Sequence, residues 1–195
     1  MNSNEIKKNI CNAFEVVRKT QQSIDRLISK LYSECENQNY CALTERFIRY
    51  NSDNYCWGWC YGRFVLLFQH GGKQDKVQIQ DAPVYAVCFD LDNCIALVAK
   101  MKYKGIEKWR KKNWAPNRLF AFENVLFSSE IYGMKEEQLK NGYKCVKIVK
   151  PEKFEKKWFF DFECLIKSEF NLVEINNENF IDKIFGTMDE LDKIF

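Results

Sequence analysis

The chain has 195 residues, of which 46% are hydrophobic and 15% aromatic, so it can bury a core and is not a disordered chain. Its 30 basic and 27 acidic residues leave a formal net charge of +3, which excludes a polycation that attracts anions over its whole surface. We expect one domain over 1–195, with an N-terminal helix (5–35), a sheet core (43–165) and a C-terminal helical segment (177–195).

The N-terminal segment 5–35 contains neither Gly nor Pro and predicts one long amphipathic helix. Its apolar residues recur at helical spacing and form one stripe, made of Ile6, Ile10, Phe14, Val17, Ile24, Ile28 and Leu31. We expect this stripe to pack across one face of a sheet, because an apolar stripe of that length needs a partner. Dimerisation through the stripe is the alternative.

The segment 55–61 is the most aromatic part of the chain and follows a polar turn. Exposed rings here would form a contact loop for a base, a nucleotide or a protein. The rings concerned are Tyr55, Trp57, Trp59 and Tyr61. The alternative is that they close the end of the core, next to a buried strand predicted over 63–69.

An apolar β-hairpin follows, with strands predicted over 84–90 and 94–101 and a loop over 91–93. A three-residue loop would place Phe89 opposite Ile95, so that large apolar side chains share one face.

Beyond residue 118 the pattern predicts further short elements. Strands are expected over 119–127, 144–149 and 158–165, and a short helix near 135–139. Gly186 and a capping box beginning at Thr187 predict two short helices at the C-terminus. The expected fold class is α+β: a mostly antiparallel sheet, a long N-terminal amphipathic helix packed on one face and short C-terminal helices.

The segment 100–118 is the most basic part of the chain, with eight positive charges against one acid, a local charge of +7. Cations interleaved with flat rings are typical of surfaces that bind single-stranded nucleic acid. The predicted nucleic-acid or anion-binding residues are Lys100, Lys102, Lys104, Lys108, Trp109, Arg110, Lys111, Lys112, Trp114 and Arg118. The alternative is a solvated strand face with the indole rings packed inward.

Signatures of catalysis are weak in this sequence. His70 is the one histidine, and no phosphate-binding glycine loop or nucleophile elbow is present. Asp161 and Glu163 lie two residues apart on a predicted strand, which leaves a metal-dependent nuclease as an outside alternative. The sequence therefore favours a protein that is not an enzyme.

Nine cysteines include a single close pair, Cys56 and Cys60, which is too few ligands for a zinc site. We expect reduced thiols, no metal, no cofactor, no membrane span and a cytoplasmic location. The expected function is that of a non-enzymatic binding or accessory protein that contacts nucleic acid or a nucleoprotein complex. The alternative is a protein-only interaction module, an inhibitor or assembly factor, that uses the loop 55–61. The oligomeric state is left open.

Overall fold

The structure is a computed structural model that describes residues 2–44, 62–71, 80–108, 119–127, 130–154, 161–176 and 178–194. Its α-helices in these ranges are α1 (Ser3–Glu34), α3 (Leu119–Leu126) and α5 (Phe180–Asp192). Its strands are β1 (Tyr40–Ala42), β2 (Arg63–His70), β3 (Val84–Asp90), β4 (Ile95–Tyr103), β5 (Met134–Gln138), β6 (Lys144–Ile148) and β7 (Phe162–Asn171). Single-turn helices connect several of them, among them Ile106–Lys108 directly after β4.

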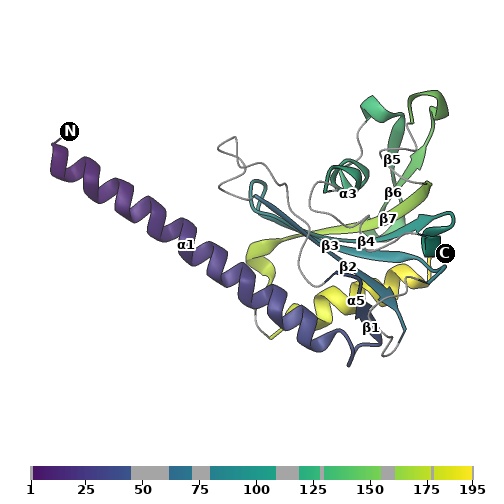
Figure 1. The fold of residues 1–195 in the computed structure, drawn as a ribbon, viewed down its shortest axis with the longest axis horizontal. Helices are drawn as coiled ribbons and strands as arrows, with labels where there is room; N and C mark the ends of the chain where they lie inside the picture. The colour runs from purple at the N-terminus through teal and green to yellow at the C-terminus, as the bar shows by residue number, and fades with distance from the viewer. Residues whose placement is uncertain are drawn as a thin grey trace.

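The strands of the described ranges form one seven-stranded antiparallel sheet in the order β1-β2-β3-β4-β7-β6-β5. Helix α5 and the C-terminal part of α1 lie against one face, and α3 lies over the other (Figure 1). The expected α+β class, with an antiparallel sheet and helices at both ends of the chain, is therefore confirmed.

Both faces of the central strands are buried. One face of the hairpin packs with α5 through residues such as Val87 and Val98, and the other packs with α3 through Cys88 and Leu97. Every residue of β3 is buried, which explains why its sequence is a continuous apolar run without alternation.

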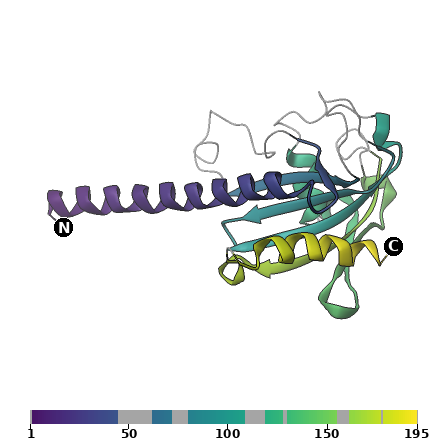
Figure 2. The same ribbon diagram turned by 90° about the horizontal axis from the view of Figure 1, so that it is seen from below.

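Helix α1 is only partly packed on the sheet. Ile24, Ile28 and Leu31 are buried, whereas Phe14 is 72% exposed and Ile10 is 53% exposed. The N-terminal half projects away from the rest of the chain (Figure 2). The prediction that the whole stripe packs on the sheet is therefore wrong for Ile10, Phe14 and Val17, because the sheet ends before the helix does.

The hairpin register differs by one residue from the prediction: Phe89 pairs with Ala96, and Asp90 pairs with Ile95. The loop is a four-residue turn that ends at Cys94, whose φ of 54° is left-handed. The argument from shared faces could not fix the register, because both faces of the hairpin are buried.

Three other expected elements are wrong. The segment 119–127 contains helix α3, and its residues Phe122, Val125 and Leu126 are buried at helical spacing. The segment near 135–139 is the edge strand β5. Helix α5 continues through Gly186, and the Thr187 hydroxyl donates to the carbonyl of Lys183 rather than capping a new helix.

Candidate nucleic-acid interface

The described part of the basic segment begins on β4, where Lys100 and Lys102 follow Ala96 and Val98 at every second residue. Alternate residues of a strand share a face, so the two lysines point toward the face that α5 covers. Lys100 is 2% exposed, whereas the side chain of Lys102 is 57% exposed. Only the outer of the two is therefore open to a ligand.

The charge of Lys100 is already matched inside the protein. Its ammonium lies 2.8 Å from a carboxylate oxygen of Asp192 and 3.5 Å from the backbone oxygen of the same residue, at the C-terminal end of α5. This arrangement places Lys100 in the core and removes it from the predicted anion-binding set.

Lys102 and Lys104 lie beside the predicted acidic pair. The ammonium of Lys102 is 3.5 Å from a carboxylate oxygen of Glu163, and both side chains are about half exposed, at 57% and 43%. The backbone N–H of Lys104 donates to the carbonyl of Asp161 at 2.8 Å, and its side chain is exposed. The acidic pair and the start of the basic segment thus occupy one end of β4 and β7.

The alternative of a metal-dependent nuclease rests on Asp161 and Glu163. Glu163 faces Lys102, and no group of three or more His, Cys, Asp or Glu side chains in the described ranges is placed to hold a metal ion. Glu163 instead forms an ion pair with Lys102 at the start of the basic segment.

Most other predicted site residues lie outside the described ranges. These are Trp109, Arg110, Lys111, Lys112, Trp114 and Arg118, together with Tyr55, Trp57, Trp59 and Tyr61. Of Lys108 the backbone alone is described, as the last residue of a single-turn helix. The roles assigned to these residues stay predictions.

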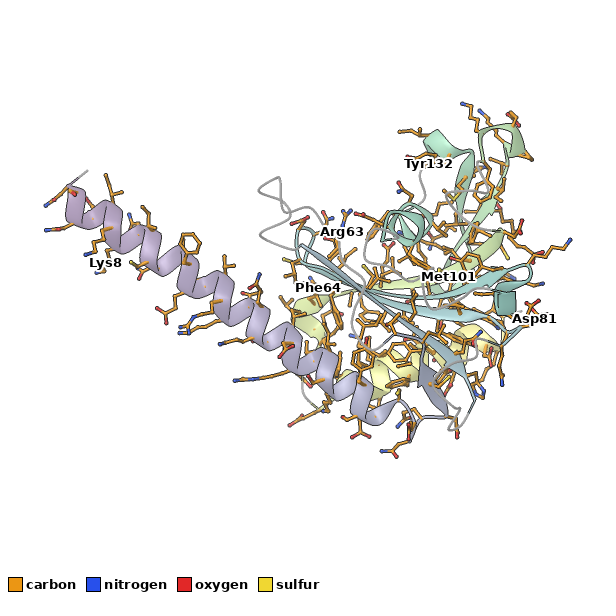
Figure 3. The ribbon with its side chains drawn as sticks, viewed as in Figure 1. Lys8, Arg63, Phe64, Asp81, Met101 and Tyr132 are labelled. Carbon is orange, nitrogen blue, oxygen red and sulfur yellow. The ribbon has the colours of Figure 1, made fainter. Side chains whose placement is uncertain are left out.

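A second charged cluster, absent from the sequence predictions, surrounds Arg63. Its guanidinium donates to Asp90 at 3.0 Å and to Glu123, and lies 4.4 Å from the centre of the Phe127 ring. Burial lowers the pKa of Arg63, but its hydrogen bond to the Glu123 carboxylate and the charge of Asp90 outweigh this effect and raise the pKa above the ordinary value. This cluster ties the start of β2 to the hairpin turn and to α3 (Figure 3).

A third cluster is centred on Lys167, which is 2% exposed on β7. Its ammonium lies 2.7 Å from Glu136 and 3.2 Å from Glu169, and donates to the carbonyl of Leu126 at 2.6 Å. Lys144 lies 2.8 Å from Glu169. Because Leu126 is the last residue of α3, the cation also sits at the negative end of that helix. The cluster holds β5, β6, β7 and α3 together.

Two buried tyrosines complete the polar contacts below α5. The hydroxyl of Tyr40 donates to Asp189 at 2.7 Å, and that of Tyr85 donates to Asp192 at 2.5 Å. Burial and these carboxylates raise the pKa of both tyrosines, so both stay protonated and act as donors. Their hydrogen bonds fix α5 on the sheet.

The fold and these contacts define an α+β protein whose described buried charges are paired internally and which carries two exposed lysines, Lys102 and Lys104, at the end of β4. No protein-family model, curated protein or solved structure matches the chain. None of the described helices is both long enough and apolar enough to cross a membrane.

Proposed function

We propose that this chain is a cytoplasmic, non-enzymatic binding protein that contacts nucleic acid, alone or within a nucleoprotein complex, through the segment from Lys102 to Arg118. The observation that carries the proposal is the exposure of Lys102, 57%, at the point where the chain leaves the sheet. The exposed Lys104 follows it. In the sequence these two lysines are followed by four further basic residues in the segment 108–112.

The charge that remains after Lys100 is removed is still large. Segment 102–118 carries seven basic residues and one acid, a local charge of +6 in a chain whose total is +3. A phosphate backbone is attracted to such a local concentration of cations, and the binding is strengthened by release of its counterions. Trp109 and Trp114 within the segment would supply flat rings on which bases stack.

Glu163 on β7 competes with a phosphate for Lys102. Its ion pair with Lys102 is half exposed and therefore weak, so a phosphate oxygen can replace the carboxylate. The expected ligand is a single strand that follows the end of β4, with phosphates at the lysines and bases against the rings.

The test is binding of a labelled single-stranded oligonucleotide, measured by fluorescence anisotropy over a range of salt concentrations. Each phosphate contact should contribute about 0.7 to the slope of log affinity against log salt. Changing Lys108, Arg110, Lys111 and Lys112 together to Glu should abolish binding and leave the melting temperature unchanged.

The matched control changes four exposed lysines elsewhere to Glu, namely Lys140, Lys147, Lys150 and Lys153. It makes the same change in net charge, so it separates a local site from general attraction. Unchanged binding by the variant at Lys108, Arg110, Lys111 and Lys112, or an equal loss of affinity in both variants, would contradict the proposed site. Mg²⁺-dependent cleavage that disappears in Glu163→Gln would show an enzyme instead of a binding protein.

A further inference from the structure

The loop between β5 and β6 contains the dipeptide Asn141-Gly142. Both residues are exposed, and both have a left-handed backbone, with a φ of 62° at Asn141 and 82° at Gly142. Asn and Gly adopt this conformation more readily than other residues, which explains why they form the turn. The same turn chemistry places a side-chain amide directly before a residue that has no side chain to shield its backbone nitrogen.

The space around Gly142 is open. A Cβ atom added to Gly142 would meet no heavy atom within 4 Å beyond its two chain neighbours. Lys140, before the dipeptide, is exposed as well. Water therefore reaches this part of the loop, and no packed neighbour obstructs an approach of the Asn141 side chain to the nitrogen of Gly142.

We propose that Asn141 is a site of spontaneous modification, at which the asparagine is converted to aspartate and isoaspartate. The backbone nitrogen of Gly142 attacks Cγ of Asn141, and the new N–Cγ bond replaces the bond from Cγ to the side-chain nitrogen. The proton of the Gly142 N–H passes through solvent to the leaving nitrogen, which departs as ammonia. Water then opens the cyclic imide, at Cγ to give aspartate or at the backbone carbonyl carbon to give isoaspartate. The conversion consumes water and needs no other reactant.

The folded hairpin slows the first step. At the ψ of 23° of Asn141 the nitrogen of Gly142 is turned away from Cβ, so closure of the imide ring requires rotation about the Cα–C bond. Two contacts resist this rotation, because they hold the ends of the loop. The backbone N–H of Leu139 donates to the carbonyl of Tyr143 at 2.7 Å, and the Tyr143 hydroxyl donates to Glu190 on α5. The rate of conversion therefore follows the fraction of time for which the loop is open.

The two products differ in their effect on the hairpin. Aspartate tolerates a left-handed backbone, as asparagine does, so this product keeps the turn. Isoaspartate adds a methylene group to the backbone and displaces Gly142 from the position that the turn requires. Leu139 and Tyr143 pack against the core cluster that contains Met188 of α5. Formation of isoaspartate should therefore loosen the contact between the hairpin and α5.

This modification site is separate from the proposed nucleic-acid interface. The loop precedes Lys144 at one end of β6, whereas Lys147 lies near the other end and pairs with Cys164 of β7. Cys164 in turn pairs with Lys102 of β4. Neither the motif nor its test depends on binding of an oligonucleotide.

The first experiment incubates the full chain in mildly alkaline buffer, once folded and once in urea, and follows residue 141 by peptide mapping with mass spectrometry. The expected change is the mass gain that accompanies replacement of NH by O, with conversion of the folded chain slower by roughly tenfold or more. The hydrogen bond to Glu190 raises the pKa of Tyr143 to about 12, so this contact persists in such a buffer. Asn93 and Asn171, which precede Cys94 and Leu172, are internal controls and should convert far more slowly than Asn141.

The second experiment tests the role of the hairpin. Tyr143→Phe removes the contact with Glu190 and should speed conversion in the folded chain by roughly threefold or more, while the rate in urea stays unchanged. Hydrogen exchange should show that the Leu139 amide loses protection in the isoaspartate product and keeps it in the matched variant Asn141→Asp.

Three outcomes would overturn the proposal. Conversion that occurs only in urea would show that Asn141 is not a modification site of the folded protein. Equal rates in the folded and the urea-treated chain would show that the hairpin does not control the reaction. Unchanged protection of the Leu139 amide in the isoaspartate product would show that the modification leaves the hairpin intact.

Discussion

The ammonium of Lys100 on β4 lies 2.8 Å from the carboxylate oxygen of Asp192 that also accepts the hydrogen bond of Tyr85. One carboxylate at the end of α5 therefore satisfies a buried cation and a buried hydroxyl on two neighbouring strands. Partial burial opposes ionisation of Asp192, but the contacts from Lys100 and Tyr85 outweigh it and lower its pKa below the ordinary value.

Asp192→Asn should reduce the free energy of unfolding by about 1–2 kcal/mol, because it removes the carboxylate that lies 2.8 Å from the buried ammonium of Lys100. The loss is smaller than for a fully buried pair, since Asp192 is 44% exposed. Urea unfolding at neutral pH measures it. The control Glu163→Gln, at a half-exposed ion pair, should change stability by less than about 0.5 kcal/mol.

The contribution of Asp192 should also depend on pH in a defined direction. A carboxyl whose pKa is lower in the folded than in the unfolded chain stabilises the fold above the unfolded value, about 3.9, and loses this effect as the pH falls through the folded pKa. The difference in stability between the wild-type chain and Asp192→Asn should thus be constant near neutral pH and shrink below about pH 4. A difference that grows on acidification would contradict this assignment.

Lys100 also illustrates what the sequence could and could not predict about the site. Its place within the apolar run of β4 was a signal of burial, since a lysine among buried neighbours requires a counter-charge. The same signal marks Lys167 on β7. Two of the counter-charges, Asp192 for Lys100 and Glu136 for Lys167, are distant in the chain, so only the folded arrangement identifies them.

Side-chain truncations near the two ends of helix α1 should differ strongly in their effect on the free energy of unfolding. Ile28→Ala should cost about 2–5 kcal/mol of unfolding free energy, because Ile28 is 5% exposed in the core. Phe14→Ala should cost less than about 0.5 kcal/mol in the dilute monomer, because Phe14 is 72% exposed. Chemical unfolding at low protein concentration measures both. A large loss for Phe14→Ala under these conditions would mean that the stripe packs within the monomer.

The sequence predicted the length of α1 and its apolar stripe correctly. It did not predict the point along the helix at which the sheet stops covering the stripe. Periodicity shows which side of a helix is apolar; it does not show whether the partner belongs to the same chain. A similar ambiguity affected α3, since a short apolar run is compatible with a buried strand or a buried helix. The edge strand β5 is charged where α3 is apolar. Charged side chains on an edge strand protect it from pairing with a further strand.

Asp90 and Asp92 lie in or beside the same hairpin turn but should differ in their effect on stability. The Asp90 carboxylate is fully buried, accepts hydrogen bonds from the backbone N–H groups of Asp92 and Asn93, and pairs with Arg63 at 3.0 Å. Asp90→Ala should therefore cost about 3 kcal/mol, since it removes one of the two carboxylates that pair with Arg63 and releases the turn. Asp92→Ala, at an exposed position, should stay within about 0.5 kcal/mol. Equal losses in urea unfolding would show that the turn does not depend on the Asp90 contacts.

The sharpest test of the nucleic-acid interface compares the same substitution at two lysines four residues apart. Lys104→Met removes an exposed cation and should reduce the slope of log affinity against log salt by about 0.7, with weaker binding at every salt concentration. Lys100→Met removes a cation that Asp192 already neutralises inside the protein, so the slope should not change. Glu163→Gln should strengthen binding, because it frees Lys102 for a phosphate. Anisotropy titrations of one labelled oligonucleotide with the three variants measure the affinity and its salt dependence. A slope that falls equally for Lys100→Met and Lys104→Met would mean that the bound state exposes Lys100, and the division between core and surface lysines on β4 would then be wrong.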